Sequence, residues 1–234
     1  MRPKYLFVAT WLTIIGAASP AISTVDISAA EAKRLQNAAS VIRALRDEPD
    51  KGIPDKLWQR AACVVVIPGL KKGALGIGGE YGKGVMNCRA GDGWSAPVFM
   101  ELEKGSWGLQ IGATEIDLVL LVMNRGGAEK LLKDKVSLGA DASVAAGPVG
   151  RSAEAATDVK LSAEILSYSR AKGLFAGIDI SGGKLGPDKD ENRDAYGANG
   201  GPTEIAFGHV KAPPEAQPLM KELSREAVAT SGKK

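Results

Sequence analysis

Glycines recur throughout this chain and divide its apolar residues into short segments. The sequence contains 29 glycines among 234 residues, well above the average share. Glycine weakens helix interiors but suits turns, bulges and close backbone approaches, so short apolar runs between glycines favour strands. Runs of this kind occupy residues 63–67, 74–79, 84–88, 94–102, 107–113 and 116–123. They predict successive antiparallel strands joined by turns.

Two more strands are expected in the second half of the chain. Apolar and polar residues alternate over 159–166, which is the period-two pattern of a strand with one buried face. A second apolar run over 174–180 ends before the glycine pair 182–183. The residues between these runs, 169–173, predict the turn that joins the two strands.

Helical signals lie towards both ends of the chain. Ser28 and Glu31 have the spacing of a capping box, and apolar residues then recur every three or four positions until Pro49. Helices are expected over 28–47, from 54, from 124, over 188–196 with Gly197 as the stop, and from 218. No repeat of fixed period divides the chain. We therefore expect one α+β domain over residues 28–230, with a curled, largely antiparallel sheet or barrel-like core flanked by N- and C-terminal helices.

The first residues have the pattern of an export signal. Arg2 and Lys4 precede an apolar run over 6–18, and small residues follow over 19–21. This run is shorter than the ~20 residues that span a bilayer. We expect residues 1–21 to be a signal peptide cleaved between 21 and 23, with the protein periplasmic or secreted and peripherally membrane-associated. An uncleaved anchor is the alternative.

The charges and the metal-binding residue types exclude several functions. Lys and Arg number 30 against 27 Asp and Glu, and a net charge of +3 is too small to hold the chain on nucleic acid. His209 is the single histidine, and with only two cysteines the chain lacks the usual ligands of a zinc site. In an oxidising compartment Cys63 and Cys88 either form a disulfide or remain two buried thiols, and their spacing leaves both alternatives open.

Three catalytic or metal-binding motifs are incomplete. The run Gly76–Tyr81 lacks the third glycine of a dinucleotide fingerprint, and Gly93–Pro97 ends in proline where a serine nucleophile elbow needs glycine. Residues 188–194 alternate oxygen ligands but lack the glycine and the glutamate of a calcium loop, so an acidic first helical turn is the preferred interpretation. We expect no enzyme, no metal and no cofactor, and paired carboxylates are the catalytic route that spacing leaves open.

Four charged residues lie among apolar or small neighbours, and we expect them to have a structural role. They are Asp117, Asp141, Arg151 and Asp158. An unpaired buried guanidinium is costly, so Arg151 is expected to be partly buried and bonded to at least one of the three carboxylates. The alternative is that these side chains point to the polar faces of their strands.

An ordered set of motifs resembles a known family. The motifs are Val64–Pro68, Gly78–Gly84, Gly93–Pro97, Gln110–Ala113, Asp117–Leu121, Val136–Asp141, Ala145–Arg151, Ser167–Gly177 and Ala195–Gly197. Together they resemble the SYLF domain of eukaryotic membrane and actin-patch adaptors and of exported bacterial proteins. The resemblance implies a lipid-binding module. In eukaryotic members it implies recognition of phosphoinositides and acidic phospholipids, and in some members association with actin.

Six cations are the candidates for contact with a lipid surface. They are Lys33, Arg34, Arg43 and Arg46 on the helix over 28–47, and Lys71 and Lys72 in the turn expected after Gly69. The helix combines an apolar stripe with basic residues, and the family uses its N-terminal segment. Lys71 and Lys72 could also form an anion patch with Lys83 and Arg89, against the alternative of a solvated hairpin end. For the stripe, the alternative is packing against the sheet.

The sequence thus predicts a non-enzymatic module that binds anionic phospholipid or phosphoinositide-like head groups at a membrane surface. Export would separate the protein from cytoplasmic actin, whereas lipid binding needs only an apolar surface and a few cations. The alternative is a structural or scaffold protein of the cell envelope that binds a protein partner.

Overall fold

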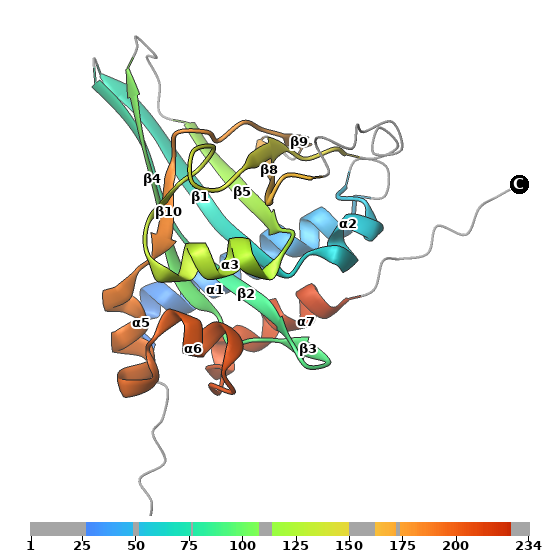
Figure 1. Ribbon diagram of the computed structural model, residues 1–234, viewed down its shortest axis with the longest axis vertical. Helices are drawn as coiled ribbons and strands as arrows, with labels where there is room; N and C mark the ends of the chain where they lie inside the picture. Colours follow the sequence, from blue (N-terminus) through green and yellow to red (C-terminus); the bar gives the residue numbers. More distant parts are fainter. Residues whose placement is uncertain are drawn as a thin grey trace, which may run out of the picture.

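A computed structural model describes residues 27–48, 52–75, 77–107, 114–149, 162–171 and 174–225. The predicted α+β class is confirmed, because one curled and largely antiparallel sheet packs against helices from both ends of the described chain (Figure 1). The expected signal peptide lies outside the described residues. Among the described residues, no helix combines the length and the apolar character needed to cross a membrane.

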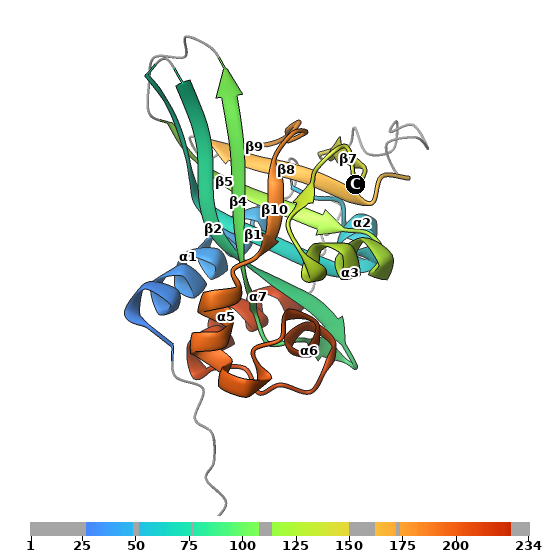
Figure 2. The same cartoon turned by 60° about the vertical axis from the view of Figure 1, so that its left-hand side comes forward.

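Ten strands form the sheet in the part of the chain that the structure describes. They are β1 (Cys63–Leu75), β2 (Ile77–Ala90), β3 (Gly93–Trp94), β4 (Val98–Trp107), β5 (Thr114–Val122), β6 (Val136–Ser137), β7 (Val144–Ala146), β8 (Ile165–Ala171), β9 (Leu174–Gly177) and β10 (Lys184–Pro187). Their order is β6-β10-β4-β2-β1-β5-β8-β7, with β3 on β2 and β9 on β8. Of the strand pairs described, β7 with β8 is the parallel one. The long strands β1, β2 and β4 project beyond the helices at one end (Figure 2).

The helices gather mainly at the opposite end of the sheet. They are α1 (Ala29–Arg46), α2 (Asp55–Arg60), α3 (Arg125–Lys133), α5 (Lys189–Tyr196), α6 (Pro202–Phe207) and α7 (Gln217–Ser224), with short 3₁₀ turns η2 (Gly197–Asn199) and η3 (Pro214–Ala216). The predicted capping box is present: Glu31 N–H donates to Ser28 Oγ over 3.2 Å, and Ser28 N–H donates to the Glu31 carboxylate over 2.6 Å. The predicted start of α3 at Asn124 and the stop of α5 at Gly197 are also confirmed.

The apolar side of α1 belongs to the core. Leu35, Ala38, Ile42 and Leu45 are each at most 2% exposed, and α1 packs against β1, β2 and α7. Burial of the leucine and isoleucine side chains stabilises the fold by roughly 1.5–3 kcal/mol each. The apolar stripe of α1 therefore packs in the core, as expected from the alternative in which the helix packs against the sheet instead of a membrane.

Glycines allow the long strands to pack closely and to bend. A Cβ at Gly84 would lie 2.2 Å from the carbonyl oxygen of Val66, so no larger residue fits there without a shift. Gly69 has φ +61°, a conformation that suits glycine, and lies where the pairing of β1 shifts register against both neighbours. The sheet can curl at Gly69 and Gly84 because glycine has no side chain to obstruct the neighbouring backbone.

The structure corrects several predicted boundaries. Residues 74–79 form no strand of their own, because β1 continues to Leu75 and pairs with β2 from Ile77. Lys71 and Lys72 lie within β1 and not in a turn. Residues 169–171, expected in a turn, belong to β8, and β8 begins at Ile165, so residues 162–164 of the expected alternating strand lie outside it. Residues 159–161 and 108–113 lie outside the described residues.

The cysteines form a disulfide. Cys63 and Cys88 face each other across β1 and β2 with their Cα atoms 4.0 Å apart, and both are fully buried. Of the two alternatives that the spacing leaves open, the structure has the bonded pair.

Candidate functional site

The predicted lipid-contacting cations lie on two separate elements. On α1, Lys33 is exposed, and the side chain of Arg43 is 57% exposed while its Nε donates to Glu222 on α7 over 2.8 Å. Both side chains face solvent, and Arg43 also fastens α1 to α7 through Glu222.

Arg34 and Arg46 are instead bound inside the protein. Arg34 is 11% exposed at its side chain and donates both terminal nitrogens to the Glu191 carboxylate. Arg46 is 7% exposed and donates to Asp55 over 3.2 Å and to the carbonyl of Arg225 over 2.7 Å. Neither guanidinium can leave its partner without a cost to the fold.

Lys71 and Lys72 lie near the projecting end of the sheet. Lys71 is exposed and pairs in register with Tyr81 on β2, whose side chain is 45% exposed. Glu103 and Glu115 occupy the neighbouring positions of the same row on β4 and β5. Glu103 is bound by Lys135 at 2.9 Å, so it is partly neutralised. The structure describes the backbone of Lys72 but not its side chain.

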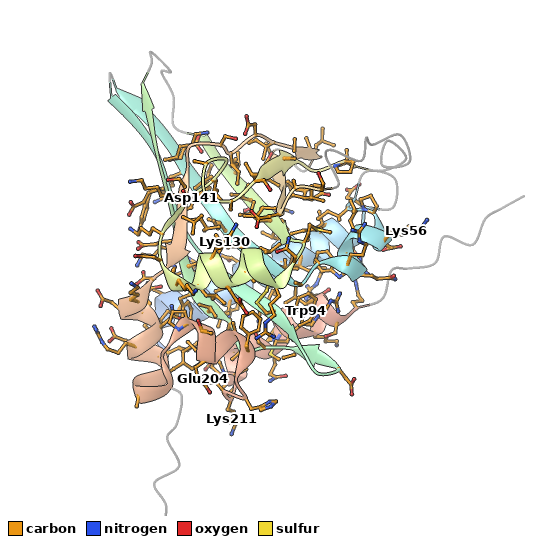
Figure 3. The ribbon with its side chains drawn as sticks, in the orientation of Figure 1. Lys56, Trp94, Lys130, Asp141, Glu204 and Lys211 are labelled. Carbon is orange, nitrogen blue, oxygen red and sulfur yellow. A yellow bond between two sulfur atoms is a disulfide. The ribbon has the colours of Figure 1, made fainter. Side chains whose placement is uncertain are left out.

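Two of the four candidate structural charges, Asp117 and Asp141, lie among the described residues. Asp117 accepts two bonds from Arg170, at 2.6 and 2.8 Å, and one from the backbone N–H of Gly69 at 3.0 Å. Asp141 accepts from the backbone N–H of Ser137, and its carbonyl accepts from Lys130, which Figure 3 labels beside it. Arg151 and Asp158 lie outside the described residues, so their pairing stays a prediction.

A charge network that sequence reasoning missed joins α1, β2 and α5. The Lys83 ammonium donates to Asp188 over 2.7 Å and to Glu191 over 2.8 Å, and Glu191 also binds Arg34. Asp188 caps α5, as the preferred helical interpretation of 188–194 requires. The partners lie more than a hundred positions apart in sequence, so no local spacing could reveal the network. Lys83 is thus held internally and is not part of an anion patch.

The pKa values in this network follow from its contacts. Burial alone would raise the pKa of Asp188, but the Lys83 ammonium and the Glu191 backbone N–H outweigh it and leave the pKa below its usual value. Burial likewise opposes ionisation of Glu191, and the hydrogen bonds from Arg34 and Lys83 lower its pKa overall. The pKa of Lys83 is raised, because both carboxylates outweigh its desolvation. All three groups are therefore charged at neutral pH.

A cleft of about 510 Å³ opens among α2, β3 and the C-terminal end of α7. We call it the arginine cleft, and it is lined by Arg46, Asp55, Trp58, Gln59, Arg89, Asp92, Gly93, Trp94, Leu223, Ser224 and Arg225. Trp94 marks its β3 side in Figure 3. Two buried indoles form its wall, with ring centroids 6.4 Å apart. Arg46 lies over Trp58 at 5.1 Å and Arg89 over Trp94 at 4.5 Å, which is cation–π geometry.

The cleft arginines differ in how their charges are compensated. Arg46 binds Asp55, and Arg225 binds Asp47 at 2.8 Å. Arg89 donates to the carbonyls of Ala61 and Trp58, each at 3.1 Å, and among the described residues no carboxylate lies within ion-pair distance of it. Desolvation lowers the pKa of Arg89, and it also lowers that of Arg46 in spite of Asp55.

Metal ligands, the histidine and the cysteines were the residue types considered for catalysis. Within the described ranges, no three His, Cys, Asp or Glu residues lie close enough to hold a metal ion. His209 is exposed near the C-terminal helices, and both cysteines are in the disulfide. The arrangement suits binding through charged and aromatic groups.

Comparison with known proteins identifies the family. Residues 103–226 match the family described as "Ysc84: Las17-binding protein actin regulator". The chain belongs to the Ysc84 family. The resemblance to the SYLF domain drawn from the sequence motifs is thereby confirmed.

Ysc84-family relatives extend well beyond the matched region. "Protein YSC84" of Saccharomyces cerevisiae is 35% identical over 182 residues, which are 76% of this chain and 39% of the relative. "LAS seventeen-binding protein 3" of the same species is 36% identical over 183 residues, again 76% and 39%. "SH3 domain-containing YSC84-like protein 1" of Rattus norvegicus is 33% identical over 201 residues, 83% of this chain and 58% of the relative. The chain thus spans about two fifths of its yeast relatives.

Proposed function

We propose that this Ysc84-family chain is a non-enzymatic module that binds anionic phospholipid or phosphoinositide-like head groups at a membrane surface. The observation that carries the proposal is the projecting end of the sheet, where exposed Lys71 lies opposite half-exposed Tyr81. A basic side chain beside an amphipathic aromatic ring suits a membrane interface. Glu115 in the same row opposes the attraction, so we expect binding that is modest and sensitive to salt.

The burial of α1 supports a contact at the sheet end and not along the helix. The apolar stripe of α1 is enclosed, and Arg34 and Arg46 are held by internal partners. Lys33 and Arg43 remain on the surface and serve as secondary contacts. Membrane binding then requires no rearrangement of the core.

Vesicle co-sedimentation tests this placement. The double variant Lys71→Gln with Lys72→Gln is compared with Lys56→Gln with Lys211→Gln, which removes two exposed lysines from α2 and the segment after α6 (Figure 3). At about 1 kcal/mol per lysine, the first variant should weaken binding to anionic vesicles up to roughly 30-fold and the control much less. Equal effects of the two variants would exclude the projecting end of the sheet as the membrane contact. Binding to no vesicle at low salt would exclude the lipid function.

A protein partner is the second candidate, favoured by the names of the relatives. The family description and the yeast relative both name Las17 binding, and the description adds actin regulation. Co-sedimentation with actin filaments without lipid tests this candidate. Saturable binding supports it, and recovery of all the protein in the supernatant contradicts it for actin.

We also propose that the protein is exported, to the periplasm or outside the cell. The Cys63–Cys88 disulfide supports this, because such bonds persist in oxidising compartments. The mature protein should begin after a cleavage between residues 21 and 23 and should lack free thiols, as intact mass and thiol titration can determine. An intact leader or two free thiols would contradict the proposal.

A further inference from the structure

We propose that the arginine cleft binds an extended segment of a partner protein through an acidic side chain. This inference rests on the protein-partner function proposed above and names the chemistry that the partner must present. Three guanidinium groups line the cleft, of Arg46, Arg89 and Arg225, against the carboxylates of Asp55 and Asp92. Asp55 binds Arg46, and Asp47 and Glu222 bind Arg225 from outside the lining. Arg89 is then the cleft guanidinium without a carboxylate partner among the described residues, which suits a singly charged carboxylate.

Arg89 is the anchoring residue. Its guanidinium lies over the Trp94 ring, and Nε and one terminal nitrogen are fixed by the carbonyls of Ala61 and Trp58. The remaining N–H groups of the fork have no carboxylate partner in the described ranges, although the residue is exposed at the cleft. A guanidinium held in a fixed orientation can bind a carboxylate with little loss of side-chain entropy.

Arg46 and Arg225 contribute positive charge to the cleft, but their guanidinium groups already have partners. Each already binds a carboxylate, Asp55 and Asp47 respectively. The Nε atoms of both arginines are buried, and they have no hydrogen-bond acceptor in the part of the chain that the structure describes. The Nε of Arg225 nevertheless lies 3.6 Å from the Glu222 carboxylate, so Arg46 is the one of the two whose burial an incoming carboxylate would make less costly.

The size and the polarity of the cleft favour a peptide over a phosphate-rich head group. Its volume of about 510 Å³ is much larger than one phosphate requires and falls within the range of sites for drug-sized ligands. Asp55 and Asp92 would repel a multiply charged head group. Gln59, Ser224 and the backbone at Gly93 offer donors and acceptors for an extended main chain.

Fluorescence anisotropy with two peptide pools tests the proposal. The pools are fluorescein-labelled octapeptides, random at seven positions, with either Glu or Gln at the fourth. A carboxylate bonded to Arg89 should make the Glu pool bind about tenfold or more tightly than the Gln pool. The Arg89→Gln variant should remove this difference. The Arg60→Gln control, which changes an exposed arginine of α2 outside the cleft, should retain it.

Asp92→Asn keeps the proposal testable if Arg89→Gln proves to disturb the fold. Asp92 is exposed and lines the cleft, so removing its charge should tighten binding of the Glu pool about two- to fivefold. A merely structural role for the cleft would not produce tighter binding.

Several outcomes would overturn the assignment. Equal binding of the two pools to the unmodified protein does so, as does unchanged affinity in Asp92→Asn. Binding of inorganic phosphate or of anionic vesicles that depends on Arg89 and exceeds that of the Glu pool would show a phosphate site instead. If both pools bind equally while actin filaments still bind, the cleft assignment fails and the protein-partner function stands. If neither peptide pool nor actin binds, both fail.

Discussion

Asp117 shows how a single side chain can hold a bend in the sheet. It bonds Arg170 on β8 and the backbone N–H of Gly69, where β1 has a positive φ and the pairing shifts register. Both side chains of the pair are less than a third exposed, at 27% for Arg170 and 18% for Asp117. The bonds should therefore contribute measurably to stability, unlike those of an exposed pair.

Asp117→Ala should lower the free energy of unfolding by about 1.5–3 kcal/mol, because it leaves a partly buried guanidinium and the Gly69 N–H without this acceptor. The control is Glu129→Ala, whose ion pair with Arg125 on α3 is exposed and should cost about 0.5 kcal/mol or less. Urea denaturation at pH 7 measures both. Equal small losses would mean that Asp117 does not stabilise the bend.

The Lys83 network predicts a defined dependence of stability on pH. The folded-state pKa values of Asp188 and Glu191 are lowered, so their contribution is present above their ordinary values of about 4 and is lost as the pH falls through the folded values. Lys83→Met removes the cation that holds both carboxylates ionised. The stability gap between the unmodified protein and Lys83→Met should be largest above pH 5 and should shrink towards pH 3. Urea denaturation at four pH values measures the gap, and a constant gap would contradict the mechanism.

At the scale of elements, the sequence predicts what local spacing determines. The capping box, the start of α3 at Asn124 and the stop at Gly197 were predictable because each depends on residues three or four positions apart. The continuity of the strands β1 and β2 was not predictable in this way. Their glycines suggest breaks, and only pairing with β4 and β5 shows that the strands continue.

Other elements depend on distant partners. The side-chain amide of Asn192 on α5 accepts from the Phe99 N–H at 2.9 Å and donates to the Phe99 carbonyl at 2.8 Å. It thus makes the pair of hydrogen bonds that a neighbouring strand would make with β4 at this position. The strand β10 and the helix α6 were also missed, although Pro202 at the start of α6 is a local helix-start signal. The arginine cleft could not be predicted for the same reason, since Arg46, Arg89 and Arg225 come from three distant segments.

The packing of α1 gives a prediction at this scale. Ile42 is fully buried, so Ile42→Ala should cost about 2–5 kcal/mol of unfolding free energy, whereas Lys33→Ala on the exposed side should change it by about 0.5 kcal/mol or less. Chemical denaturation compares the two variants. A small loss for Ile42→Ala would reopen the interpretation of α1 as a membrane-contacting helix.

At the scale of the whole molecule, the two ends of the described chain close on each other. The helix α7 packs along α1, and Arg43 with Glu222, Arg46 with the Arg225 carbonyl and Arg225 with Asp47 fasten the contact. The arginine cleft opens beside this closure. The stability of the fold and the shape of the cleft therefore depend on the same pair of helices.

A chain that ends at Ala216 tests this dependence. Removing α7 uncovers the face of α1 that it covers and takes away Glu222 and Arg225, so the domain should unfold at clearly lower urea concentration and bind a hydrophobic dye. Within the full chain, Leu223→Ala should cost about 2–5 kcal/mol because Leu223 is 2% exposed, while Lys221→Ala on the exposed side of α7 should have little effect. The same midpoint for the shortened and the full chain would show that α7 is dispensable. It would also show that the fold does not depend on the arginine cleft, because the cleft residues Leu223, Ser224 and Arg225 could then be removed without loss of stability.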